Sequence, residues 1–229
     1  MQQEATQADL ELVRAAAQRG VPQAQLIYGQ MLLDGKLLPQ NATSALHWFE
    51  RAARGGDVMA MNMVGRCLDQ GWGIAASPNL AAPWFRKAAE KGLDWGMYNL
   101  ATLLTLGSGV KEDKIEALYW LRKAADLNHA KSINILGGFY EDGWVVQKDM
   151  AIAKDHYRRA AEGGDFRGHF NYARILASEG REAEALSHLK KVPETATPAF
   201  VAKMKQFFAK WPSPALQAFA ASLPEPQNA

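Results

Sequence analysis

An Ala-Ala pair recurs along this chain at a constant interval of 36 residues. The five pairs are Ala16-Ala17, Ala52-Ala53, Ala88-Ala89, Ala124-Ala125 and Ala160-Ala161. Other columns keep the same step, and the clearest holds Trp48, Trp84 and Trp120, with His156 in the fourth place. A fixed period of this length is typical of a repeat architecture, in which each unit buries its apolar face only by stacking on its neighbours.

Each unit is predicted to contain two helices, which in the first repeat span residues 23–34 and 42–54, with Gly35 ending the first. The second helices are preceded by residue types whose side chains cap helix N-termini: Asn41, Ser77, Asp113 and Asp149. They are followed by residue types that favour the left-handed C-cap: Gly20, Gly56, Gly92, Asn128 and Gly164. The sequence therefore predicts an all-α solenoid of antiparallel helix pairs.

We expect residues 1–229 to form a single solenoid domain. A lone N-terminal helix at 8–20 is followed by four full repeats at 21–56, 57–92, 93–128 and 129–164. Residues 165–192 form a degenerate fifth repeat, because the hairpin loop is shorter and the second helix has lost its Ala pair. Aromatic residues at helical spacing in 193–229 predict a helical cap, since a solenoid must cover its terminal apolar face. The alternative for this tail is an amphipathic helix that binds a membrane or a partner.

The repeat resembles the Sel-one-like repeat, a variant of the tetratricopeptide repeat. The match covers roughly residues 8–192, and its clearest copies run over 107–125 and 135–164. Leu37 and Val145 depart from the family pattern, because they stand at the second glycine of the hairpin. The resemblance implies a right-handed α-solenoid that acts as a scaffold or adaptor, often in bacteria. Members of the family include immunity proteins that neutralise secreted toxins.

No pattern in the sequence indicates catalysis, a cofactor or a metal. The five histidines are scattered, and neither C-x-x-C nor H-E-x-x-H occurs. His156 stands in the tryptophan column and is expected to pack in the core. The glycine-rich segments 71–73 and 107–109 occupy the hairpin-turn column, so we interpret them as turns rather than phosphate loops. We expect a non-catalytic protein with no catalytic residue, cofactor or metal site, and an enzyme is the weak alternative.

Basic residues recur just before the Ala pairs, at Arg51, Arg86-Lys87, Arg122-Lys123 and Arg158-Arg159. Because the net charge is only +2, we interpret them as a solvated face with acidic neighbours, rather than a site for nucleic acid or lipid headgroups. No run of 18 apolar residues is present. We expect neither nucleic-acid binding nor membrane insertion, and a monomer before the partner binds.

The binding site is predicted on the first helix of each pair, which lines the concave groove in related helical-hairpin repeats. The residue type in its groove-facing columns varies from repeat to repeat, as specificity requires. These columns hold Gln30, Asn62, Arg66, Asp69, Tyr98, Thr102, Asn134, Glu141, Phe170 and Arg174. Trp72, Trp144 and Trp95 lie at or beside turns, where they either anchor a partner or fold back on their own repeat. We expect a dedicated protein partner, a bacterial toxin or effector, and the alternative is a general adaptor in envelope or signalling complexes.

The compartment is not fixed by the residues themselves. Cys67 is the single cysteine, so no intrachain disulfide can form. The segment Met1–Ala5 lacks the basic and apolar regions of a signal peptide. The alternative is that a signal peptide was removed and replaced by a start methionine. The family resemblance favours a periplasmic location after signal removal, with a cytoplasmic location as the alternative.

Overall fold

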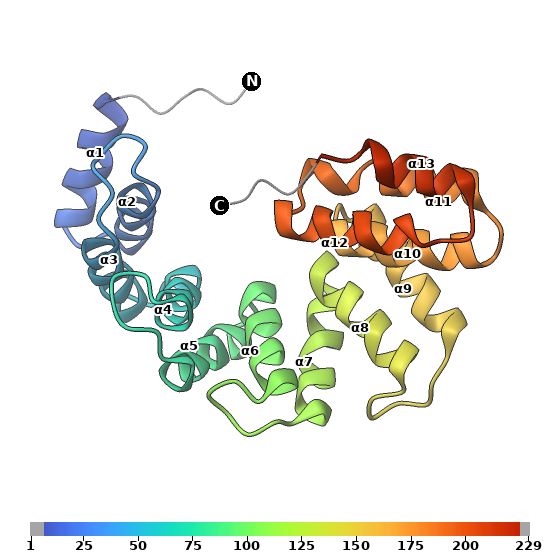
Figure 1. The fold of residues 1–229 in the computed structure, drawn as a ribbon. Helices are drawn as coiled ribbons and strands as arrows, with labels where there is room; N and C mark the ends of the chain where they lie inside the picture. Colours follow the sequence, from blue (N-terminus) through green and yellow to red (C-terminus); the bar gives the residue numbers. More distant parts are fainter. Residues whose placement is uncertain (1–6, 225–229) are drawn as a thin grey trace. The chain divides into compact units, whose positions relative to one another are not determined.

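The computed structural model describes residues 7–224, which contain thirteen α-helices, one 3-10 helix and no strand (Figure 1). The all-helical prediction is confirmed. The segment Met1–Ala5 considered above lies outside the described residues. The first helices are α1 (Gln7–Gln18), α2 (Pro22–Asp34), α3 (Ala42–Arg54), α4 (Val58–Gln70), α5 (Pro78–Glu90), α6 (Asp94–Leu106) and α7 (Lys114–Asp126). The remaining elements are α8 (Ala130–Asp142), α9 (Met150–Glu162), α10 (Phe166–Ser178), α11 (Glu182–Leu189), η1 (Val192–Glu194), α12 (Pro198–Ala209) and α13 (Pro214–Ser222).

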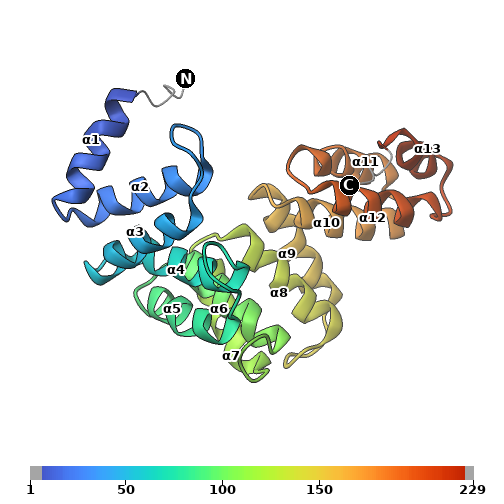
Figure 2. The same ribbon diagram turned by 60° about the vertical axis from the view of Figure 1, so that its left-hand side comes forward.

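The chain forms two compact units, residues 1–120 and 121–229, which we call the N-terminal unit and the C-terminal unit. In the N-terminal unit, consecutive helices pack against each other from α1 through α6. In the C-terminal unit the same holds from α8 to α11, and α12 packs against α13 (Figures 1 and 2). Within each unit, the apolar contacts are therefore distributed along the row of helices, as in other repeat arrays.

The predicted N-caps form at three of the four second helices. Asn41 accepts from the Ser44 backbone N–H at 2.9 Å, and Asp113 and Asp149 act in the same way. The prediction is wrong for Ser77, whose side chain makes no capping hydrogen bond. The Ser77 hydroxyl donates instead to the Asn79 amide oxygen at 2.7 Å, while the Leu80 N–H is satisfied by the Ser77 backbone carbonyl at 3.0 Å.

The predicted C-caps are confirmed at every position of their column. Gly20, Gly56, Gly92 and Gly164 have φ between 82° and 93°, and Asn128 has φ 61°. Asparagine tolerates this left-handed conformation better than other residues with a side chain. The one departure from glycine in the column therefore keeps the same backbone geometry.

Small side chains lie where consecutive helices meet. The Ala pairs of the second helices are buried, and Ala52, Ala88, Ala124 and Ala160 have no exposed surface at all. Close approach of the helix axes requires small residues at these positions, because a larger side chain would have to displace the facing backbone. The alanine columns thus mark the helix contacts that the period predicts.

The C-terminal helices share one apolar cluster with the fifth helix pair. Leu176 of α10 and Leu189 of α11 are buried in this cluster together with apolar residues of α12 and α13. The residues that α12, α13 and the end of the tail contribute are Val201, Met204, Phe208, Leu216, Ala220 and Leu223. The tail therefore covers the apolar face of α10 and α11. Within residues 7–224, no helix combines the length and the apolar character needed to cross a membrane.

Candidate partner-binding surfaces

In the N-terminal unit, α4 and α6 are joined by a hydrogen bond between two asparagine side chains. The Asn99 amide nitrogen donates to the Asn62 amide oxygen at 2.8 Å. Asn62 is only 2% exposed. The expectation that the Asn62 side chain is accessible to a partner is therefore wrong, because this side chain is buried and hydrogen-bonds the neighbouring first helix.

Arg66 and Trp72 form a stacked pair at the C-terminal end of α4. The Arg66 guanidinium lies over the Trp72 ring, 4.8 Å from its centroid. Both side chains are half-buried, as is Asp69, which accepts from the Gln70 amide at 2.5 Å. Trp72 thus folds back on its own repeat while part of its surface stays accessible.

Aromatic side chains also meet on α6. The Trp95 and Tyr98 rings are 6.0 Å apart in an edge-to-face arrangement, and Trp95 is 38% exposed. Thr102 donates to the Tyr98 backbone carbonyl at 2.8 Å. On α2, Gln30 is half-buried and donates to Asp34 at 2.8 Å. Gln30, Trp95, Tyr98 and Thr102 therefore each retain some accessible surface.

The C-terminal unit repeats the asparagine bridge. The Asn171 amide on α10 donates to the Asn134 amide oxygen on α8 at 2.9 Å, and Asn134 is 8% exposed. The expectation of an open contact residue is wrong for Asn134 for the same reason as for Asn62. The two bridges lie two repeats apart, and each links consecutive first helices.

Glu141 and Arg174 pair with each other rather than pointing outward alone. The Arg174 guanidinium donates to the Glu141 carboxylate, which also accepts from the Tyr157 hydroxyl at 2.7 Å. Burial acts to raise the pKa of Glu141, but the hydrogen bonds from Arg174 and Tyr157 outweigh it and hold the pKa below its usual range. Glu141 is therefore ionised at neutral pH and fixes the ring of Tyr157.

Two further aromatic residues of the predicted set lie in the C-terminal unit. Phe170 is half-buried and packs against the tail, with ring centroids 5.4 Å from Phe200 and 5.5 Å from Phe207. Trp144 lies edge-to-face on Phe139 at 5.6 Å and is 40% exposed. Apart from Asn62 and Asn134, the predicted residues remain candidates for a partner-binding surface. Their role in binding stays a prediction.

The basic residues before the Ala pairs differ in their surroundings. Arg86 forms a bidentate pair with Glu116, and Arg158 contacts both Asp155 and Glu162 at 2.6 Å. Arg51 and Lys87 instead lie over the rings of Trp48 and Trp84. These contacts agree with a largely solvated, internally compensated face.

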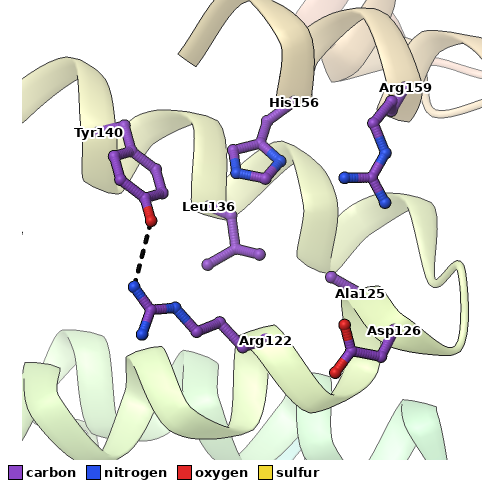
Figure 3. A pocket seen from close by; sticks show the side chains of 7 residues that line it. All are labelled: Arg122, Ala125, Asp126, Leu136, Tyr140, His156 and Arg159. Atoms are coloured by element: carbon purple, nitrogen blue, oxygen red, sulfur yellow. Dashed lines mark hydrogen bonds between the residues drawn. The ribbon is translucent and has the colours of Figure 1, made fainter. Parts of the chain in front are cut away.

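A small pocket of about 130 Å³ opens between α7, α8 and α9 in the C-terminal unit (Figure 3). Polar groups and an apolar wall line it: Arg122, Ala125, Asp126, Leu136, Tyr140, His156 and Arg159. His156 is half-buried and its Nδ1 is buried without a hydrogen-bond partner, so it is not a wholly packed core residue. Sequence reasoning missed this pocket because its polar side chains come from three helices with no local motif.

Metal-ligand clusters and cysteine thiols are two kinds of site that can carry chemistry. Within the part of the chain that the structure describes, no three His, Cys, Asp or Glu side chains lie where they could hold a metal ion. Cys67 is buried, and this burial raises the pKa of its thiol to about 11. The Cys67 thiol is therefore protonated at neutral pH and is not an activated nucleophile.

A family model described as Sel1 repeat matches the chain in four consecutive segments, residues 22–57, 58–93, 96–129 and 130–165. No curated protein matches the chain. Among solved structures, a Sel1 repeat protein from Oxalobacter formigenes is similar with a TM-score of 0.74 and 23% sequence identity. That similarity covers 93% of this chain and 98% of the other.

Two further structures extend the comparison. A protective antigen present in uropathogenic Escherichia coli strains, which displays an SLR fold, has a TM-score of 0.72 and 28% identity. The similarity covers 87% of this chain but only 44% of the antigen. An immunity protein from Pseudomonas aeruginosa has a TM-score of 0.59 and 16% identity, over 90% of this chain and 84% of that protein. At this low identity the likeness to the immunity protein shows a shared fold.

Proposed function

Because the chain belongs to the Sel1 repeat family, we propose that it acts by holding one dedicated protein partner on the groove-facing side of its first helices. The Sel1 repeat is a protein-interaction fold and in general a non-catalytic scaffold. The proposal adds to this the choice of a single partner and the residues that bind it. We define the first-helix surface as Gln30, Arg66, Asp69, Trp72, Trp95, Tyr98 and Thr102, all in the N-terminal unit.

The observation that carries the proposal is the fixed presentation of aromatic and basic side chains on α4 and α6. Asn99 and Asn62 tie the two helices together through a partly buried hydrogen bond. Arg66 stacks on Trp72, and Trp95 is held edge-to-face by Tyr98, so these large side chains lose little further entropy on binding. Trp, Tyr and Arg are the residue types that most often dominate interface energetics.

The residues of the C-terminal unit fit this role less well. Glu141 and Arg174 are engaged with each other and with Tyr157, and Phe170 packs against the tail. Opening these contacts would cost free energy before a partner could use them. Trp144 is the exception, because 40% of its surface is exposed. We therefore centre the proposal on the N-terminal unit.

We further propose that the partner is a bacterial toxin or effector that this chain neutralises. The support is the shared fold with an immunity protein from Pseudomonas aeruginosa. Neutralisation by occlusion requires only a rigid complementary surface, and no catalytic group has to be added to the fold. A general adaptor would instead bind several unrelated proteins through the same repeats.

The test expresses the full chain together with each protein encoded beside its gene in the source genome, and follows the growth of the host cell. Co-expression with a toxic partner should restore growth, and the purified pair should associate in a binding titration. The combined Arg66→Ala, Trp95→Ala and Tyr98→Ala variant should bind at least about tenfold more weakly, a loss of about 1.4 kcal/mol.

The matched control replaces exposed residues on the second helices, His47→Ala and Lys87→Ala, and should leave affinity unchanged. Both variants must keep the melting temperature of the wild type, so that a loss of affinity does not reflect unfolding. A partner that binds the triple variant as tightly as the wild type would overturn the surface assignment. Association with several unrelated proteins and no rescue of growth would replace the toxin partner with the adaptor function.

A further inference from the structure

Within residues 7–224, the pocket between α7, α8 and α9 contains two guanidinium groups that form no ion pair with a carboxylate. Over residues 7–224, Arg159 forms no ion pair, and the hydrogen bond of Arg122 goes to the neutral Tyr140 hydroxyl at 3.1 Å (Figure 3). Asp126 lines the same pocket without forming an ion pair with either arginine. Arg158, the chain neighbour of Arg159, is by contrast held by two carboxylates.

Further hydrogen-bond donors face the same space. The Tyr140 hydroxyl accepts from Arg122, so its own proton is left to donate to a ligand or to water. His156 Nδ1 is buried and has no hydrogen-bond partner. A buried N–H without an acceptor is rarer in proteins than a buried acceptor without a donor. We therefore place the ring proton on Nε2 and leave Nδ1 unprotonated. Burial, together with the charges of Arg159 and Arg122, lowers the pKa of His156 and keeps the ring neutral at pH 7.

We propose that this pocket binds one carboxylate group, supplied by an aspartate or glutamate side chain of the protein partner. The choice of that source rests on the proposed function, whereas the pocket itself does not. Guanidinium groups recognise planar carboxylates through paired, charge-assisted hydrogen bonds. The two arginines and Asp126 together carry a net charge of +1, so one bound carboxylate would neutralise the pocket.

The apolar wall supports an acidic side chain as the occupant. Leu136 and Ala125 line the pocket beside the charged groups, where they can contact the methylene stem of a glutamate or aspartate. The volume of about 130 Å³ leaves room for a group of that size. The site therefore offers charge, donors and an apolar contact in the arrangement that a carboxylate on a short alkyl stem requires.

The test titrates the full chain with sodium acetate and with two blocked pentapeptides, Ac-Ala-Ala-Glu-Ala-Ala-NH2 and its Gln counterpart, at constant ionic strength. Histidine ring signals are followed by 1H–13C NMR, with the His156 signal assigned from His156→Phe. The Glu peptide should shift this signal to saturation, with a dissociation constant at least about tenfold lower than that of acetate, because its stem and backbone add contacts. The Gln peptide should cause no saturable shift.

A pair of neighbouring arginines provides the matched variants. Arg159→Gln should weaken binding of the Glu peptide at least about tenfold, whereas Arg158→Gln should leave it unchanged. If Arg159→Gln lowers the melting temperature strongly, Arg122→Gln takes its place with the same expected loss. Equal effects of Arg158→Gln and Arg159→Gln would overturn the assignment to this pocket.

The remaining outcomes separate the sources of the carboxylate. Acetate binding as tightly as the Glu peptide would overturn an acidic side chain as the occupant and indicate a free small acid. No saturable shift with either carboxylate, or equal shifts with the Gln peptide, would overturn the pocket as a carboxylate site. These titrations use no partner protein. A negative result would therefore overturn the carboxylate site without affecting the proposal for the first-helix surface, which the co-expression experiment tests.

Discussion

The ring of Tyr157 on α9 lies against Gly137 on α8, so that a Cβ atom at position 137 would be 2.5 Å from Tyr157 Cε1. The ring is held in place by the hydrogen bond from its hydroxyl to Glu141 at 2.7 Å. The same contact joins Gly65 to Phe85 and Gly29 to Phe49, where the nearest distances would be 2.5 and 2.7 Å. The glycine column thus exists because an aromatic ring from the second helix occupies the space of a side chain.

Gly137→Ala should therefore lower the free energy of unfolding by roughly 1–3 kcal/mol, because the fixed ring must be displaced. The neighbouring Gly138 is the matched control, since a Cβ there would meet only the Tyr157 hydroxyl at 3.9 Å. Gly138→Ala should raise stability by roughly 0.5–1 kcal/mol through the better helix propensity of alanine. Urea unfolding of both variants checks this prediction, and a gain of stability in Gly137→Ala would show that the ring moves freely.

Cys67 should resist thiol reagents in the folded chain. The residue has no exposed surface, and burial raises the pKa of its thiol to about 11. At pH 8 only about one thiol in a thousand is then the reactive thiolate, even before access is considered. Ellman's reagent should react at least about a hundredfold more slowly with the native chain than with the chain in urea. Since Cys67 is the single cysteine, stoichiometric labelling of the native protein within minutes would contradict the burial.

The period and the caps could be read from sequence because they depend on local chemistry. Asn128 replaces glycine at a C-cap and takes φ 61°, as the tolerance of asparagine for the left-handed region predicts. Ser77 has an equally suitable residue type, yet its hydroxyl turns to Asn79. A capping residue type therefore predicts where a helix begins more safely than it predicts which hydrogen bond its side chain makes.

The candidate binding residues were harder to assign, because a polar residue on a first helix can face solvent or a neighbouring helix. Asn62 and Asn134 turn out to be bridged by Asn99 and Asn171. The signal was present, since both asparagine pairs recur at an interval of 72 residues. A polar residue type that recurs in the same column of several repeats indicates a structural contact. The groove prediction instead assumed that the residue types in these columns vary. The two arginines of the pocket, Arg122 and Arg159, belong to recurring basic columns, but the recurrence did not show that they meet Tyr140 and His156 in one pocket.

Stability should fall as the pH drops from 7 to 5, because of two histidines in the C-terminal unit. His169 Nδ1 and His188 Nδ1 are 2.9 Å apart, so one neutral ring donates and the other accepts. Burial, followed by the charges of His188 and Lys191, lowers the pKa of His169 to about 4, and burial also lowers the pKa of His188. Below about pH 6.5 the unfolded chain therefore takes up protons that the folded chain does not, and folding loses stability.

Because His188 is only half-buried and water screens the pair, we expect a loss of about 1 kcal/mol between pH 7 and pH 5. Urea unfolding at both pH values measures it. The combined His169→Gln and His188→Gln variant should show a smaller loss, while replacement of the exposed His47 by Gln should leave the difference as in the wild type. An unchanged pH dependence in the double variant would assign the effect to other groups.

The tail should contribute to folding through Phe208 and much less through its neighbour Phe207. Phe208 has no exposed surface and shares an apolar cluster with Leu176 and Leu189, whereas Phe207 is 41% exposed. Phe208→Ala should lower the free energy of unfolding by about 3–5 kcal/mol, since it removes buried apolar surface and leaves a cavity. Phe207→Ala should cost less than about 1.5 kcal/mol, because its ring is already partly in water. Urea unfolding of the two variants measures the difference, and small, equal losses would mean that α12 is not a cap and is available to a partner instead.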